Sequence, residues 1–90
     1  RFIFFSKAVA QLATLITFSF EIVHAHDWTS ALTIPLLSIS KRKYKKVFTV
    51  HNAAYQGRFS ADKFELTGLP KAFFTWEKME FYNDINLLKG

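Results

Sequence analysis

The chain contains no cysteine, so neither a disulfide framework nor a thiolate metal site is available to it. Glycine is scarce too, and the three glycines form neither a G-x-G-x-x-G pattern nor a Walker loop, so any nucleotide would be held mainly by residues outside this chain. The apolar stretch over residues 8–20 is interrupted by polar side chains and is shorter than the ~20 residues that a spanning helix needs. We therefore expect no membrane partner.

Acidic residues are few: the chain has seven Asp and Glu residues and twelve Lys and Arg residues, which gives a formal net charge of +5. Five of the twelve basic residues lie within residues 41–46, where Tyr44 interrupts the run. Such a run can contact phosphates, but loops between a helix and a strand are normally polar. Because the rest of the chain is close to neutral, we interpret the run as a solvated loop and expect no nucleic-acid partner.

Apolar side chains recur at spacings of three and four near the start of the chain, and they are Phe5, Val9, Leu12, Ile16 and Phe20. This period predicts one face of a buried helix over residues 2–17. A short strand over residues 22–24 and a helix over residues 28–39 follow. Pro35 should kink that helix or split it in two, and Asp27 stands where its N-cap is expected.

A second strand is predicted over residues 46–50. Strand, helix and strand with short connections form a βαβ unit, whose two strands must run parallel. Later patterns are weaker: a short helix over residues 61–66, a break at residues 68–70 and helical turns over residues 76–82. The predicted fold class is α/β with a Rossmann-like parallel sheet, and the eleven phenylalanines indicate a slice through a larger core.

Both predicted strands stop on polar side chains. The first ends at His26 and Asp27, followed by Trp28, and the second ends at His51 and Asn52. Ligands of open parallel sheets bind beyond the carboxyl ends of the strands, and neighbouring strands lie about 5 Å apart. We therefore expect one crevice lined by these groups, suited to a polyhydroxylated ligand. The alternative, in which Asp27 only caps a helix and His51 only completes a turn, stays open at this point.

His24 and His26 also form a candidate metal pair. Residues two apart in a strand point to the same side, so the pair could bind zinc, with Asp27 or His51 completing the set. The metallo-hydrolase pattern His-x-His-x-Asp-His is broken, however, because Trp28 and Thr29 stand where Asp and His are required. A metal-dependent hydrolase using His24 and His26 is thus the less favoured enzyme class, and we assign no metal to the crevice.

Residues 24–32, 48–57 and 80–90 resemble consecutive blocks of a known family, and residues 1–8 resemble the block before them. The His-Asp-Trp and His-Asn-Ala-Ala-Tyr-Gln-Gly segments are the most distinctive. In this order they are similar to the bacterial glycogen synthases and plant starch synthases. The resemblance implies that residues 1–90 are part of the N-terminal, acceptor-side domain of a two-domain GT-B glycosyltransferase, with the C-terminal nucleotide-binding lobe outside the chain.

The resemblance further implies transfer of glucose from ADP-glucose, or UDP-glucose, to the non-reducing end of an α-1,4-glucan. Configuration is retained in that family and neither a metal nor another cofactor takes part. The resemblance places His51 against the donor glucose near its reacting carbon and Asp27 in the same crevice, so both are candidate catalytic residues. The candidate substrate-binding residues are Trp28, Asn52, Tyr55 and Gln56. The implied location is the bacterial cytoplasm or the plastid stroma.

Parts of the family pattern are absent from this chain. The Lys-x-Gly-Gly loop and the Lys, Arg and Glu of the nucleotide lobe do not occur in it, so we expect the isolated chain to be inactive. Ala53 replaces a commonly larger apolar residue, and Thr29-Ser30 is a variant after His-Asp-Trp, but neither change removes a polar role. The alternative function is a non-catalytic carbohydrate-binding remnant of the same fold.

Overall fold

The computed structural model describes residues 1–15, 17 and 19–90. Its elements follow in the order α1 (Phe2–Leu15), β1 (Ile22–His26), α2 (Asp27–Ala31), α3 (Thr33–Ser38), β2 (Lys45–Thr49), β3 (Arg58–Ser60), the 3₁₀ helices η1 (Ala61–Thr67) and η2 (Lys71–Phe73), β4 (Glu80–Phe81) and β5 (Asp84–Asn86). Within the described residues, no helix has the length and apolar character needed to cross a membrane.

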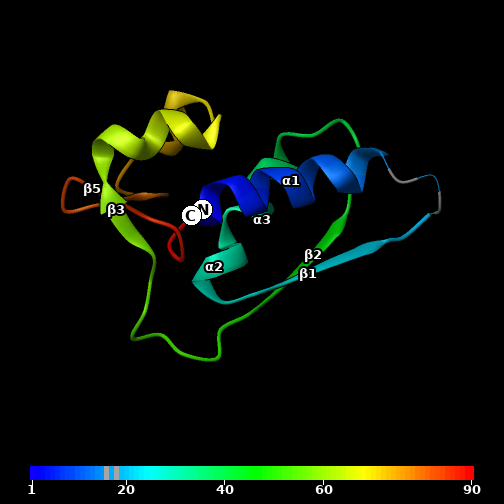
Figure 1. The fold of residues 1–90 in the computed structure, drawn as a ribbon, viewed down its shortest axis with the longest axis horizontal. Helices are drawn as coiled ribbons and strands as arrows, with labels where there is room; N and C mark the ends of the chain where they lie inside the picture. The colour runs from blue at the N-terminus through cyan, green and yellow to red at the C-terminus, as the bar shows by residue number, and fades with distance from the viewer. Residues whose placement is uncertain (16, 18) are drawn as a thin grey trace.

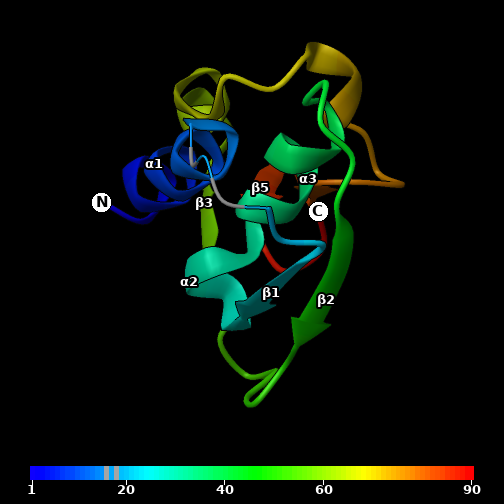
Figure 2. The same ribbon diagram turned by 90° about the vertical axis from the view of Figure 1, so that its right-hand side faces the viewer.

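The first half of the chain is the predicted βαβ unit. β1 and β2 pair in parallel, with Ile22 opposite Lys45 and His26 opposite Thr49. Both arrowheads therefore point to the same end of the molecule in Figure 2. α2 packs on both strands and α1 packs on α2 and α3, beside which it lies in Figure 1. The predicted parallel α/β architecture is confirmed.

The connecting helix is split in two, as Pro35 led us to expect. α2 ends at Ala31 and α3 begins at Thr33. Pro35 is the third residue of α3, where backbone N–H groups have no partner within the helix, so its missing N–H loses no hydrogen bond. In one continuous helix the proline ring would clash with the carbonyl group of Ala31, and the break avoids that clash.

α1 confirms a helix near the start of the chain, but the predicted buried face is wrong. Phe5 and Leu12 are 49% and 56% exposed, whereas Ser6 and Ala13 are the buried residues of the helix. The buried side consists of small residues, which let α1 approach α2 and α3 closely. Ile16, part of the predicted face, lies outside the described residues.

The basic run is anchored by its aromatic residue. Tyr44 is 7% exposed, and its hydroxyl donates a 2.7 Å hydrogen bond to the carbonyl oxygen of Ala13. Its ring stacks on Phe20 with centroids 5.1 Å apart, so Phe20 lies beyond α1 instead of extending its face. Arg42 lies over both rings. The four lysines of the run remain exposed, which agrees with a solvated loop.

The second half of the chain contains an antiparallel sheet, in the order β3-β5-β4, that the sequence pattern did not predict. The helical turns expected over residues 76–82 are wrong. β4 and β5 are joined instead through Tyr82 and Asn83, whose φ angles of 49° and 63° suit a tight two-residue hairpin. η1 confirms the predicted short helix in 3₁₀ form, and the break follows at Gly68 with φ 73°.

The main core joins the two halves. It contains apolar residues from α2, η1 and the antiparallel sheet, and its buried members are Ala31, Leu32, Phe64, Leu69, Met79, Ile85 and Leu87. A smaller cluster under α1 contains Ala13, Leu37 and Tyr44. The larger cluster therefore holds the antiparallel sheet against the βαβ unit, and the loop of residues 50–57 runs between them (Figure 1).

Candidate functional site

The candidate site forms at the carboxyl edge of the β1–β2 pair, as predicted. Asp27 follows β1 directly and His51 lies two residues beyond the end of β2. Asp27 Oδ1 accepts hydrogen bonds from the backbone N–H groups of His51 and Asn52, at 2.7 and 3.3 Å. One carboxylate oxygen thus brings three of the predicted site residues together.

Asp27 is not the predicted N-cap. It is the first residue of α2, the N-cap position belongs to His26, and no side chain caps the helix there. Asp27 has φ 56°, a left-handed conformation that Asp adopts more readily than most residues. The backbone N–H of His26 is bonded instead to the hydroxyl of Ser30 at 2.8 Å. The alternative in which Asp27 only caps its own helix is therefore wrong.

The junction keeps the Asp27 carboxyl group charged. The backbone N–H of His51 lowers the pKa of Asp27 below its ordinary value of 3.8, partial desolvation opposes this, and the N–H of Asn52 lowers it further. Both N–H groups bind Oδ1, and within the described part of the chain Oδ2 has no hydrogen-bond partner. One oxygen ties the strand ends together and the other is free for a ligand.

Three imidazole rings line up along the same edge. His26 Nδ1 lies 3.1 Å from His51 Nε2, and His24 Nε2 lies 2.7 Å from Thr49 Oγ1. The ring centroids of His24 and His26 are 4.1 Å apart, and those of His26 and His51 are 5.4 Å apart. Across the residues that the structure describes, no three His, Cys, Asp or Glu side chains gather as a metal site would require. The candidate metal pair is engaged in ring hydrogen bonds instead.

A pocket of about 550 Å³ lies beside this edge. Its lining residues are Trp28, Ala54, Tyr55, Gln56, Gly57, Arg58, Phe59 and Phe81. Asp27, His51 and Asn52 do not line it, so the predicted set falls into two groups. The first is the hydrogen-bonded junction and the second is the pocket, and the Asp27–Trp28 peptide bond and the loop of residues 51–57 connect them.

Gly57 allows the loop to approach Trp28 closely. It has φ 67°, and a Cβ atom there would lie 2.6 Å from Trp28 Cε3 and 3.1 Å from Leu87 Cβ. Glycine alone meets both the conformational and the steric requirement. Phe2 meets the same indole edge-on at a centroid distance of 4.6 Å, and the ring of Phe59 lies 6.2 Å from it. Trp28 is therefore a packed wall of the pocket.

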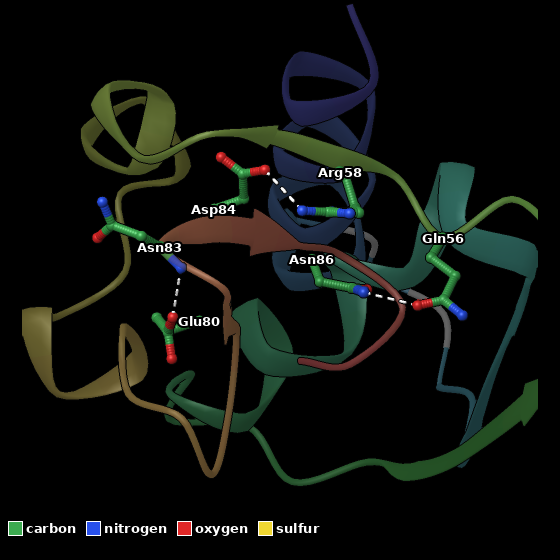
Figure 3. Close-up of polar contacts among 6 residues, drawn as sticks. All are labelled: Gln56, Arg58, Glu80, Asn83, Asp84 and Asn86. Atoms are coloured by element: carbon green, nitrogen blue, oxygen red, sulfur yellow. Dashed lines mark hydrogen bonds and ion pairs between the residues drawn. The ribbon is translucent and has the colours of Figure 1, made fainter.

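Several polar residues that support the pocket were not predicted. Gln56 Oε1 accepts a 2.7 Å hydrogen bond from Asn86 Nδ2, and Asn86 is only 1% exposed. Arg58 forms a 2.9 Å ion pair with Asp84. Figure 3 shows these two pairs joining the end of the loop and β3 to β5. The one available signal was the family resemblance of residues 80–90, which carried no assigned role.

The fold and the site together define an α/β domain whose parallel strands end in a polar, hydrogen-bonded rim. The family model of the starch synthase catalytic domain matches residues 1–90. The chain belongs to this family. The family predicted from the sequence blocks is therefore confirmed.

Individual relatives agree. The chain is 42% identical over 96 residues to the glycogen synthase of Thermodesulfovibrio yellowstonii, covering 100% of this chain and 19% of that protein. It is 51% identical over 70 residues to the glycogen synthase of Yersinia pestis, covering 78% of this chain and 15% of that protein. The chain thus spans about one fifth or less of the length of these relatives.

A solved structure shares the fold. It is the catalytic domain of Starch Synthase IV from Arabidopsis thaliana bound to ADP and acarbose, and its TM-score to this chain is 0.88 at 28% identity. The match covers 99% of this chain and 20% of that one. The predicted GT-B glycosyltransferase fold is confirmed over this part of the domain.

Proposed function

We propose that this chain supplies part of the acceptor-side domain of a retaining glucosyltransferase. The enzyme transfers glucose from ADP-glucose, or UDP-glucose, to the non-reducing end of an α-1,4-glucan. The observation that carries the proposal is the bond between the carboxylate of Asp27 and the backbone of His51, at the ligand-binding edge of a chain that the starch synthase family model matches from end to end.

Asp27 and His51 are the proposed catalytic residues. Transfer with retention passes through a cationic, oxocarbenium-like sugar, which fixed carboxylate and carbonyl oxygens stabilise. The lowered pKa of Asp27 keeps its carboxylate charged, and Oδ1 already orients the backbone at His51. The imidazole of His51 can then donate a hydrogen bond to a sugar hydroxyl, or accept one from it.

The pocket is the proposed place for further sugar units. Tyr55 is 69% exposed and can pack its ring against a sugar face, and Trp28 forms the packed wall opposite the solvent. Gln56 accepts a hydrogen bond from Asn86 and donates one to the carbonyl oxygen of Ala53, so its second amide hydrogen can bind a hydroxyl group. Asn52 Oδ1 accepts a 2.9 Å bond from the backbone N–H of Ala54, which leaves the Asn52 amide hydrogens for the substrate.

The relatives support the choice of donor and compartment. The Arabidopsis relative is bound to ADP, which favours ADP-glucose over UDP-glucose as the donor here. The other relatives are bacterial, so the proposed location is the bacterial cytoplasm or the plastid stroma. No metal or other cofactor is assigned to the reaction.

The test uses the full-length gene product with glycogen and labelled ADP-glucose or UDP-glucose. We expect label to enter the glucan, preferentially from ADP-glucose, and to be released by an exo-acting α-1,4-glucan hydrolase. Glucan binding with no incorporation from either donor would overturn the proposal in favour of the non-catalytic remnant. Chelator-sensitive release of free sugar would overturn it in favour of the hydrolase.

A further inference from the structure

We propose that His26 is a positioning residue: through its Nδ1 it holds the imidazole of His51 in one orientation and one tautomer toward the sugar. This inference rests on the proposed function, because it assigns His26 a role only through His51. It concerns a residue that the sequence placed at the crevice and in a candidate metal pair, but to which it gave no catalytic or substrate-binding role.

The need for such a residue follows from the position of His51. Asp27 fixes only the backbone of His51, through the bond to its N–H group. The His51 side chain is exposed and stands on a loop, so its ring could rotate freely without a partner. Within the described residues, the one hydrogen bond to that ring comes from His26, with Nδ1 and Nε2 3.1 Å apart.

His26 is itself held firmly. It is the last residue of β1 and lies opposite Thr49 in the parallel ladder. The hydroxyl of Ser30 bonds to both its N–H and its carbonyl group, at 2.8 and 2.6 Å. Its ring packs in a tilted arrangement against His24, whose Nε2 is bonded to Thr49 Oγ1 at 2.7 Å. The orientation of His51 is thus transmitted from the rigid strand pair to the loop.

The contact also couples the tautomer of His51 to that of His26. In a neutral pair, one hydrogen lies between His26 Nδ1 and His51 Nε2. If His51 Nε2 donates it, His51 Nδ1 is an acceptor for a sugar hydroxyl; if Nε2 accepts it, Nδ1 carries the hydrogen and donates. Without His26 the ring can rotate and populate both tautomers, which misplaces the group that faces the substrate.

Two substitutions separate hydrogen bonding from packing in the full-length gene product. His26→Phe keeps a flat ring for packing against His24 but removes the nitrogen. His26→Asn keeps a polar atom near the position of Nδ1. We expect His26→Phe to lower kcat by roughly tenfold to a hundredfold, the scale of a misplaced reacting group, with KM for glucan unchanged. We expect His26→Asn to restore most of the loss.

A double-mutant cycle and a spectroscopic measurement complete the test. His26→Phe should cause no further loss of kcat in a His51→Ala background, and the ¹⁵N shifts of the His51 ring should show one tautomer in the wild type and averaged values in His26→Phe. If His51→Ala leaves kcat unchanged, the proposed role of His51 fails and this inference with it. If His51→Ala lowers kcat but His26→Phe does not, this inference alone is overturned. Averaged ¹⁵N shifts in the wild type overturn it too, even if His26→Phe fails to fold.

Discussion

Asp27 Oδ1 and the backbone N–H of His51 form a 2.7 Å hydrogen bond between residues that are 24 apart in the chain. The bond closes the carboxyl edge of the β1–β2 pair without being part of the strand ladder. The loop that begins at His51 carries most of the predicted site residues. Anything that weakens this bond should therefore displace the loop and not only the carboxylate.

The first prediction concerns acid. Because the backbone N–H of His51 lowers the pKa of Asp27 below 3.8, the charged carboxylate stabilises the folded state above about pH 4, and this contribution is lost as the pH falls through the lowered pKa. We expect the full-length wild type to lose stability over that window, and Asp27→Asn to lose less. Urea midpoints across the pH range measure the difference.

The control for that prediction is Asp62→Asn. Lys63 lowers the pKa of Asp62, but this carboxylate lies on η1 and not at the carboxyl ends of β1 and β2. Asp62→Asn should leave glucose transfer unchanged, whereas Asp27→Asn should reduce it. A ¹³C titration that placed the pKa of Asp27 at or above 3.8 would contradict the account of the junction.

The second prediction concerns His51→Ala. We expect turnover to fall by about a hundredfold or more, because the imidazole serves the reacting sugar, while the Kd for a malto-oligosaccharide changes little. Steady-state kinetics and calorimetry measure the two effects. Lys43→Ala, at the opposite end of β2, is the control and should change neither. Unchanged turnover in His51→Ala would leave His51 only a structural role.

The third prediction compares two glycines. Gly57 and Gly68 both have positive φ angles, 67° and 73°, but only Gly57 would bring a Cβ atom within 3 Å of a neighbour, Trp28. We expect Gly68→Ala to lower the free energy of unfolding by about 1 kcal/mol from backbone strain, and Gly57→Ala by roughly 2–4 kcal/mol because overpacking is added. Denaturant unfolding of both variants of the full-length protein measures the two losses. Equal losses would show that the close approach to Trp28 is unimportant.

The fourth prediction concerns metal. The ring nitrogens of His24 and His26 that face β2 and its following loop are bonded to Thr49 and His51. We therefore expect glucose transfer by the full-length enzyme to survive exhaustive chelation, with the rate after zinc is added back as the control. Stoichiometric zinc in elemental analysis, together with a rate that depends on this zinc, would favour the metal-dependent hydrolase instead.

The fifth prediction concerns the 90-residue chain expressed alone. Phe4 and Leu15 on α1 are 77% and 68% exposed, in addition to Phe5 and Leu12. The free energy of unfolding is typically a difference of only ~5–15 kcal/mol between large terms. Exposure of the apolar side of α1 to water should therefore remove it. We expect poor solubility, no cooperative melt and no glucose transfer. Substituting Phe4 and Leu15 with Gln should improve solubility, and a sharp melt with activity in the unsubstituted chain would disprove the expectation.

Local residue patterns were sufficient for the parallel strand pair that positions Asp27 and His51. Apolar runs ending on polar residues located β1 and β2 to within two residues of their observed ends. Parallel pairing followed because a helix between two neighbouring strands returns the chain to the end at which the first strand began, so the second strand runs in the same direction. Asp27 and His51 were therefore expected at one edge, and they lie there.

Other features depended on contacts between distant segments. A carboxylate that follows a strand can cap the next helix or bind a neighbouring loop, and local rules favour the cap. Asp27 binds the loop because the backbone N–H of His51 lies within hydrogen-bond distance of its carboxylate. The apolar period of α1 is compatible with burial of either side, and packing against α2 and α3 selected the small residues. The hairpin at Tyr82 and Asn83 contains no glycine, so the sequence did not indicate its positive φ angles. The pairing of β5 with both β3 and β4 requires this turn. In each case the local sequence was compatible with two arrangements, and the free energy of a long-range contact favoured one of them.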